Sequence, residues 1–313
     1  MRHSGCAAAS DCTTGRYTTL SPSWFTLKTS SVMLANPTIT RDVRATTSVM
    51  SVAPSCPACD AVADTEIGRA GVCHLWRCAC GLVFADRATW CDPYSATDYY
   101  DPALQPAQSY PLQITATERD RIVSVRRFMP AGRLLDFGGG IGKTALAAHA
   151  EGFQSIVLED SHKAVAEGQT HHPEIEWHEG RTIPDRIPND SLDVVTLFHV
   201  LEHLPDPRTT LAQIHRKLRP GGWLVIEVPN WGSYMRRLHG LRWQFVLDHH
   251  VNHFTAASLT PLVEKTGFKR CAVEFRRTFA INEAQAWKEP LKKMLCLFGF
   301  GDILRCSFRK SAA

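Results

Sequence analysis

The sequence contains neither a long apolar run nor a strong excess of charge. No apolar stretch among the 313 residues approaches the roughly 20 residues that a membrane-spanning helix needs. The N-terminal region lacks the continuous apolar core of a secretory signal. A net charge of +4 is too small to indicate nucleic-acid binding by itself. We therefore expect a cytoplasmic protein with no membrane span and no nucleic-acid partner; its oligomeric state is not indicated.

The composition changes along the chain and predicts four segments. Residues 1–50 are poor in acidic residues, rich in Ser and Thr, and without a clear period. We expect a disordered leader or a non-native extension there; an organelle transit peptide is the alternative reading. A cysteine-bearing module follows at 51–90, then a connecting loop rich in Pro and Tyr at 91–115. The remaining segment, 116–313, is expected to be the main domain.

The main domain alternates between apolar runs and helix-like patterns. Helices are expected at 117–129, 144–151, 207–218 and 258–266, and strands at 133–137, 155–159, 192–198 and 223–228. This alternation predicts an α/β fold built on a doubly wound, mostly parallel sheet. Such sheets bind ligands beyond the carboxyl ends of their strands, where the strand order switches.

A glycine-rich turn follows the first strand of this domain, in the stretch LLDFGGGIGKT (134–144). A phosphate-binding loop needs glycine where Phe137 stands. The dinucleotide fingerprint needs glycine where Lys143 stands. What remains is Asp136 at the strand tip, followed by alternating glycines. An acid there repels phosphate and attracts a cation, which favours a ligand with an ammonium and a sulfonium group.

A second acid stands at the end of the next strand. Glu159 follows the glycines by about twenty residues, the place from which a carboxylate accepts hydrogen bonds from the ribose hydroxyls of an adenosine. The two acids together favour an adenosine-containing ligand that carries positive charge.

Two downstream stretches carry a family resemblance: LDVVTLFHVLEHLPDP (192–207) and RKLRPGGWLVIEVPN (216–230). With LLDFGGGIG and VLED, they resemble the motifs of class I S-adenosylmethionine-dependent methyltransferases. The resemblance covers roughly residues 54–313. It implies a Rossmann-like, seven-stranded sheet whose last strand is reversed. ILRCSFRK (303–310) resembles that last strand, and KRCAVEFRR (269–277) the one before it.

The resemblance also assigns cofactor-binding residues. These are Asp136, Gly138 and Gly140 at the methionine half of S-adenosylmethionine, Glu159 at the ribose, and Phe198 and His199 near the sulfonium. Members of the family often place an acid after the third strand, at the adenine amine. Here Gly180 and Arg181 stand at that place, so backbone groups near Thr182 and Ile183 are the expected substitute.

The cysteines of the 51–90 module have metal-like spacing. Cys56-x-x-Cys59 and Cys78-x-Cys80 would supply four thiolates for tetrahedral zinc. The module resembles the zinc ribbon that precedes this methyltransferase type in some bacterial enzymes. Because the second pair is one residue closer than usual, Cys73 is an alternative fourth ligand; free buried thiols are the other reading. The zinc would be structural.

Histidines supply the candidates for proton transfer. The segment DHHVNHFTAASL (248–259) resembles a motif found in many members of the family, and His250 and His199 are the candidate general bases. A purely structural loop is the alternative for His250. A metal site is a further reading, although no carboxylate stands at a usual spacing. Glu202 and His203 are expected to open a helix after the fourth strand, and we expect a structural or supporting role for them.

Together these features predict an enzyme that transfers a methyl group from S-adenosylmethionine to a small-molecule acceptor. A nucleotide-linked sugar, a glycan and a secondary metabolite are the candidate acceptors. The alternative is a non-catalytic zinc-ribbon binding protein that retains the cofactor fold. A nicotinamide oxidoreductase is disfavoured by Lys143.

Overall fold

The computed structural model describes residues 53–71, 73–86, 112–277 and 289–311. Residues 51–313 form one compact unit. The expected leader at 1–50 and most of the expected connecting loop at 91–115 lie outside the described residues. Among the described helices, none combines the length and the hydropathy that crossing a membrane would require.

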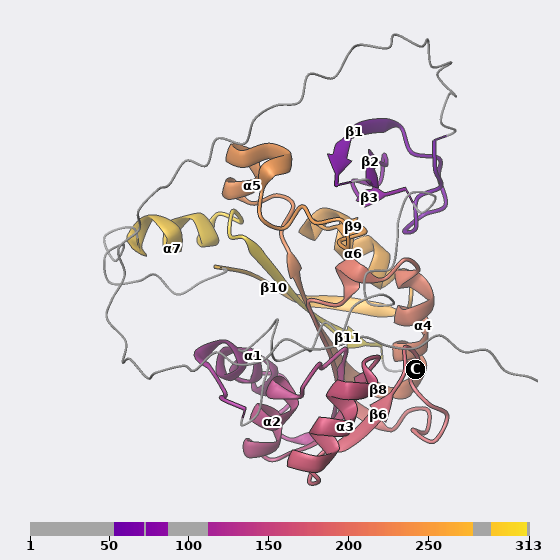
Figure 1. Cartoon of the computed structure of the whole chain (residues 1–313), viewed down its shortest axis with the longest axis vertical. Helices are drawn as coiled ribbons and strands as arrows, with labels where there is room; N and C mark the ends of the chain where they lie inside the picture. The colour runs from indigo at the N-terminus through magenta and orange to yellow at the C-terminus, as the bar shows by residue number, and fades with distance from the viewer. Residues whose placement is uncertain (1–52, 72, 87–111, 278–288, 312–313) are drawn as a thin grey trace, which may run out of the picture. The chain divides into compact units, whose positions relative to one another are not determined.

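Seven strands form the main sheet, in the order β10–β11–β8–β7–β4–β5–β6 (Figure 1). Their bounds are β4 Gly132–Phe137, β5 Phe153–Glu159, β6 Glu176–Glu179, β7 Leu192–Phe198, β8 Leu218–Pro229, β10 Phe268–Arg276 and β11 Ile303–Lys310. Strands β4 to β8 pair in parallel, whereas β11 is antiparallel to both of its neighbours. The predicted α/β fold and its reversed last strand at 303–310 are therefore confirmed.

Helices cover both faces of this sheet (Figure 1). They are α1 Ala116–Arg126, α2 Lys143–Ala150, α3 His162–His171, α4 Pro207–Lys217, α5 Tyr234–His239, α6 Ala256–Glu264 and α7 Glu289–Leu297, with single 3-10 turns at η3 Leu201–His203 and η4 Gly240–Arg242. Local chemistry fixes several starts. Thr115 and Glu118 form a capping box for α1, and Asp206 caps α4 just before Pro207.

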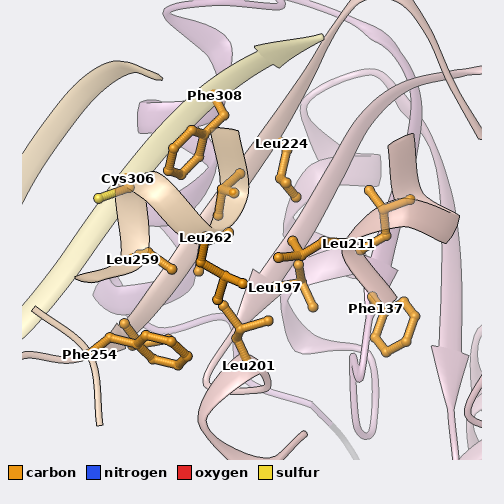
Figure 2. Close-up of a cluster of buried hydrophobic side chains, with 14 of the residues drawn as sticks. Phe137, Leu197, Leu201, Leu211, Leu224, Phe254, Leu259, Leu262, Cys306 and Phe308 are labelled. Atoms are coloured by element: carbon orange, nitrogen blue, oxygen red, sulfur yellow. The ribbon is translucent and has the colours of Figure 1, made fainter. Parts of the chain in front are cut away.

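Two apolar clusters hold the layers together. On one face, Ile122 and Val125 of α1 pack with Ala147 and Ala148 of α2 against the sheet. The larger cluster lies on the other face, where α4 and α6 meet the strands. Figure 2 shows its centre: Phe137, Leu197, Leu201, Leu211, Leu224, Phe254, Leu259, Leu262, Cys306 and Phe308. Leu197 and Phe198 point to opposite faces because side chains alternate along a strand.

Several predicted boundaries differ from the structure by one to five residues. Strand β8 begins at Leu218, not at Trp223, because the Pro-Gly-Gly segment is an irregularity within the strand and does not precede it. Leu192 pairs with Leu218, and Val194, two residues later, pairs with Trp223, five residues later. Helix α6 begins at Ala256, two residues earlier than predicted, where Thr255 supplies its cap. The helix that we expected to open at Glu202 and His203 is only the turn η3.

A second, four-stranded sheet contains the cysteine module. Its strands are β1 Thr65–Ala70, β2 Cys73–Arg77, β3 Val83–Ala85 and β9 Asn252–His253, in that order. The last strand comes from the far end of the main domain: Val83 pairs with His253. The guanidinium of Arg208, in α4, also forms two hydrogen bonds to the Asp60 carboxylate of the module. The module is therefore packed into the main domain and shares its larger apolar cluster.

Candidate functional site

The end of β4 brings a buried acid to the glycine turn. Asp136 is only 3% exposed, and its Oδ1 accepts a 2.6 Å hydrogen bond from the hydroxyl of Thr196 on β7. Burial raises the pKa of Asp136 to about 6, against the lowering effects of Thr196 and of the charge on Arg121. Within the described residues Asp136 forms no ion pair, so a positively charged ligand would stabilise its ionised form.

The turn after Asp136 needs glycine for steric reasons. Gly138 has φ +69°, and a Cβ there would lie 2.6 Å from Val200 Cγ2. A Cβ on Gly139 would lie 2.9 Å from Asp136 Oδ2. The backbone can therefore pass close to the acid and to the residues that follow β7. A side chain at either glycine would collide with Val200 or with Asp136 itself.

Glu159 fixes the other side of the turn. Its Oε2 accepts a 2.8 Å hydrogen bond from the Gly140 N–H, and its Oε1 accepts a 3.0 Å bond from the Ser161 N–H. Burial raises its pKa, while these backbone donors oppose that effect. A carboxylate offers about four acceptor positions, so capacity remains for hydroxyl donors of a ligand. The sequence assigned Asp136, Gly140 and Glu159 separately; the structure brings them together.

The chain turns sharply after β7. His199 has φ +60°, a left-handed conformation that is uncommon for a residue with a side chain. The turn places its ring between two acids: Nδ1 lies 3.1 Å from Glu202 Oε1, and Nε2 lies 3.5 Å from Glu227 Oε1. Burial opposes protonation of the ring, but both carboxylates favour it and raise the pKa of His199 to about 9. Since the side chain is 33% exposed, a ligand can reach it.

Phe198 is enclosed by cations. Its ring is 8% exposed, and the guanidinium of Arg121 on α1 lies 4.8 Å from its centroid. Arg305 on β11 lies 6.0 Å from the same centroid. Cation–π contacts of this kind favour a guanidinium over the ring face. Phe198 thus orients α1 against the strand ends beside His199.

A buried ionic network lies next to these residues, and sequence reasoning missed it. Glu227 on β8 is 3% exposed and accepts two hydrogen bonds from Arg121, at 2.7 and 2.9 Å. Arg305, its partner across the sheet, donates two more, at 2.5 and 2.7 Å. Although burial alone would raise the pKa of Glu227, His199 and the two arginines hold it well below its usual range. A glutamate inside an apolar strand was the one signal available.

The histidine segment 248–259 runs through β9 into the start of α6, and its His249 contacts His203 of η3. His250 is 6% exposed; its Nδ1 donates to the Phe245 carbonyl at 2.9 Å. Its ring centroid lies 4.7 Å from that of His203 and 5.0 Å from that of His249. His253 is buried as well, with its ring 4.6 Å from that of Trp231. The structure therefore groups His250 with other histidines, and not with the Glu202–His199–Glu227 contacts.

The four cysteines expected to bind metal come together in the cysteine module. Cys56 Sγ lies 3.6 Å from Cys80 Sγ, Cys59 Sγ lies 3.5 Å from Cys78 Sγ, and all four sulfurs lie within 4.8 Å of one another. Tetrahedral zinc with four thiolates would place its sulfurs about 3.8 Å apart, so the cluster fits the ion. Cys73, the alternative ligand, instead directs its thiol to the Asp248 carbonyl at 3.7 Å.

Backbone donors also support this cluster. Burial raises the pKa of the Cys56 and Cys80 thiols, that of Cys80 to about 11, although the N–H groups of Ala58 and Leu82 bond to their sulfurs and oppose this effect. Despite burial, the pKa of Cys59 is lowered, because bonds from the Ala61 N–H and the neighbouring thiols outweigh that effect. Such donors stabilise thiolates, which are the form that a metal binds.

The backbone groups near Thr182 and Ile183, expected to contact the adenine, lie in the segment after β6. The side chain of Gln213 bonds to both backbone groups of Ile183, at 3.2 Å to N and 3.1 Å to O. Ile183 is therefore already engaged. Arg181 forms a 2.7 Å ion pair with Asp160, the residue after Glu159.

Comparison with known proteins supports the interpretation of the strand-end motifs. A family model described as a methyltransferase domain matches residues 115–272, half of the chain. A Mycolicibacterium smegmatis protein described as an S-adenosylmethionine-dependent methyltransferase is 31% identical over 132 residues, 42% of this chain and 49% of its own. A ubiquinone biosynthesis O-methyltransferase of Thiobacillus denitrificans is 28% identical over 121 residues, 36% of this chain and 50% of its own. The chain thus matches about half the length of these relatives.

A solved structure agrees with the fold. The S-adenosylmethionine-dependent methyltransferase from Archaeoglobus fulgidus superposes with a TM-score of 0.50 at 18% identity, over 68% of this chain and all of that one. Together with the order of the seven strands and the match over residues 115–272, this agreement leads to one conclusion. The chain belongs to the methyltransferase-domain family.

Proposed function

We propose that the protein transfers a methyl group from S-adenosylmethionine to a hydroxyl group of a small-molecule acceptor. The observation that carries this proposal is the pair of buried carboxylates at one glycine turn: Asp136 precedes it, and Glu159 accepts a hydrogen bond from the Gly140 N–H. S-Adenosylmethionine supplies a methyl group on a sulfonium, together with an ammonium and two ribose hydroxyls.

The residues at the turn fit that ligand in charge and in hydrogen bonding. Asp136 has a raised pKa and gains from a nearby cation. Glu159 retains acceptor capacity for the ribose hydroxyls after its bonds to Gly140 and Ser161. Gly138 and Gly140 let the backbone approach, and Phe198 and His199 border the same strand ends.

For the acceptor's proton we propose His199 ahead of His250. His199 is partly exposed, and Glu202 and Glu227 stabilise its imidazolium, the species formed when it accepts a proton. His250 is buried and packs against His203 and His249, which makes it the second choice. Holding the acceptor close and aligned would supply most of the remaining rate enhancement.

The candidate acceptors remain those suggested by the sequence: a nucleotide-linked sugar, a glycan or a secondary metabolite. The similarity to a ubiquinone biosynthesis O-methyltransferase supports oxygen as the atom that is methylated. For the ribbon, we propose a structural zinc ion on Cys56, Cys59, Cys78 and Cys80, supported by the fit of their sulfurs.

Two measurements test this function. Calorimetry should detect binding of S-adenosylmethionine and none of NAD at the same concentration. Incubation with methyl-labelled S-adenosylmethionine should then transfer label to one class among nucleotide sugars, phenolic metabolites and glycans. Binding without transfer to any class or to cell extract would favour the alternative, a non-catalytic protein that retains the cofactor fold. Failure to bind the cofactor would overturn both.

A further inference from the structure

Three histidines from distant parts of the sequence meet beside the ribbon. His203 ends η3, whereas His249 and His250 precede β9. One ring nitrogen from each lies within 4.8 Å of the other two. The ring centroids of His203 and His249 are 5.4 Å apart, and both lie within 5.0 Å of His250. The cluster therefore brings three potential metal ligands to one point.

The hydrogen bonds of these rings fix which nitrogen can bind an ion. Nδ1 of His203 donates to the His249 carbonyl at 3.0 Å, and Nδ1 of His250 donates to the Phe245 carbonyl at 2.9 Å. Since a carbonyl only accepts, the proton stands on Nδ1 and the lone pair of the neutral ring on Nε2. Nδ1 of His249 lies 3.1 Å from the Asp248 carboxylate. Metal-ligating histidines are held by partners of this kind on their other nitrogen.

A second, independent feature is a group of unsatisfied polar atoms next to the histidines. In the part of the chain that the structure describes, Glu202 Oε2, Asn252 Oδ1 and His253 Nε2 are buried without a hydrogen-bond partner. The charge of Glu202, which is 1% exposed, acts on both His203 and His250. Buried polar atoms of this kind usually bond to a water molecule or an ion. A hydrated cation would supply both donors and positive charge.

We propose that His203, His249 and His250 bind one divalent transition-metal ion of the zinc class, with water in the fourth position. Imidazole ligands suit zinc, and three of them with one open position form a recurring arrangement. Water on the ion would be a donor for Glu202 Oε2.

The site would join η3, directly after β7, to the segment before β9. The same two segments are tied by a 2.7 Å bond from Asn252 Nδ2 to the Leu204 carbonyl. It would also assign His250 as a ligand in place of a base. Since it concerns metal binding alone, the inference goes beyond the proposed function and does not depend on it.

Metal content provides the test. The full chain, loaded with zinc and dialysed, should retain about two ions: one on the cysteines and one on the histidines. His249→Ala should retain about one, whereas the control His239→Ala, an exposed histidine of α5, should retain both. With cobalt in place of zinc, sulfur-to-cobalt charge-transfer bands identify the cysteine site, and these should be unchanged in His249→Ala.

A second variant keeps all three ligands, so that loss of metal binding can be told apart from misfolding. Asp248→Asn weakens the carboxylate partner of His249 and should lower zinc affinity at this site by about 10–100-fold. If the parent protein retains only the ion with cobalt–sulfur bands, or if the His249 and Asp248 variants hold zinc as tightly as the parent, the inference is wrong.

Discussion

Two groups of buried carboxylates lie near the ends of neighbouring strands in one sheet, and their pKa values are shifted in opposite directions. Asp136 and Glu159, at the ends of β4 and β5, have raised pKa values because burial dominates. Glu227 and Glu202 are buried as deeply, yet their pKa values are lowered, that of Glu202 to about 2. Against the effect of burial, His199 lowers both, and Arg121 and Arg305 lower that of Glu227 further.

The difference lies in the partners. Glu227 has its cations within the protein, from Arg121, Arg305 and His199. Among the described residues, Asp136 and Glu159 bond only to a hydroxyl and to backbone N–H groups. A carboxylate that is buried without a cation is costly for the protein alone and becomes favourable when a cationic ligand binds. Glu227 and Glu202 therefore support structure and the neighbouring histidine, whereas Asp136 and Glu159 are suited to binding.

The largest change in stability is expected for Glu227, whose partner cations are side chains of the protein itself. Glu227→Gln would leave Arg121 without its carboxylate partner and Arg305 with its Asp120 pair alone, so the free energy of unfolding should fall by about 3–5 kcal/mol. Chemical denaturation followed by circular dichroism measures this. Glu151→Gln is the matched control, because its ion pair with Arg126 is exposed and should contribute about 0–1 kcal/mol. Equal losses in the two variants would contradict the comparison.

The second prediction concerns the histidine between the two acids of the structural group. His199→Ala should lower the turnover rate by about 10²–10⁴-fold if the ring takes the acceptor's proton. It should also weaken cofactor binding, because His199 borders the strand end beside Val200 and Gly138. His239→Ala is the control. A parent-like rate in single-turnover methyl transfer would exclude His199 as the base.

The same residue predicts the pH dependence. Glu202 and Glu227 outweigh burial and raise the pKa of His199 to about 9, so at pH 7 most of the rings are protonated and cannot act as a base. The turnover rate should therefore rise about tenfold per pH unit and level off near pH 9, or lower if the sulfonium disfavours the imidazolium. A flat profile between pH 6 and 9 would mean that another group takes the proton.

Much of the binding half could be predicted from the sequence, because its signals are local. Asp136 and the glycines lie within one turn, and Glu159 ends the next strand; the predicted strand 192–198 agrees with β7. The cysteine pairs are also local, with two short spacings. When residues are only a few positions apart in the sequence, their spacing constrains where their side chains can point. The spacing alone therefore indicates which groups can act together.

The other half depends on contacts that no spacing encodes. Arg305 meets Glu227 only because β11 pairs with β8, and His203 meets His250 only because η3 lies against the segment around β9, to which the bond from Asn252 Nδ2 to the Leu204 carbonyl ties it. In the sequence, no carboxylate stands at a usual metal-ligand spacing from the histidine segment. Glu202 comes close to this segment through the fold, from 48 positions earlier in the chain than His250. Each such pair depends on the sheet order, which the sequence indicated only through resemblance.

The third prediction tests the binding group directly. Glu159→Ala should weaken S-adenosylmethionine binding at least tenfold, since a charge-assisted hydrogen bond contributes roughly 1.5–3 kcal/mol. Calorimetry measures it. Glu179→Ala is the matched control: that acid ends the adjacent strand β6, but it is exposed and pairs with His162. An unchanged affinity in Glu159→Ala would exclude the ribose assignment.

The smallest effect on stability, and the sharpest contrast with Glu227→Gln, is expected for Asp136→Asn. The substitution keeps an oxygen for the Thr196 hydroxyl and removes a charge whose ionisation burial disfavours, so stability at pH 7 should stay within about 1 kcal/mol of the parent. Cofactor affinity should fall nonetheless, because the charge that faces a cation is gone. In the parent protein, the raised pKa means that Asp136 takes up a proton as the pH falls through about 6. Affinity for S-adenosylmethionine should therefore decline below pH 6 in the parent and stay level in Asp136→Asn. If both proteins show the same pH dependence by calorimetry, Asp136 does not face the cofactor's charge.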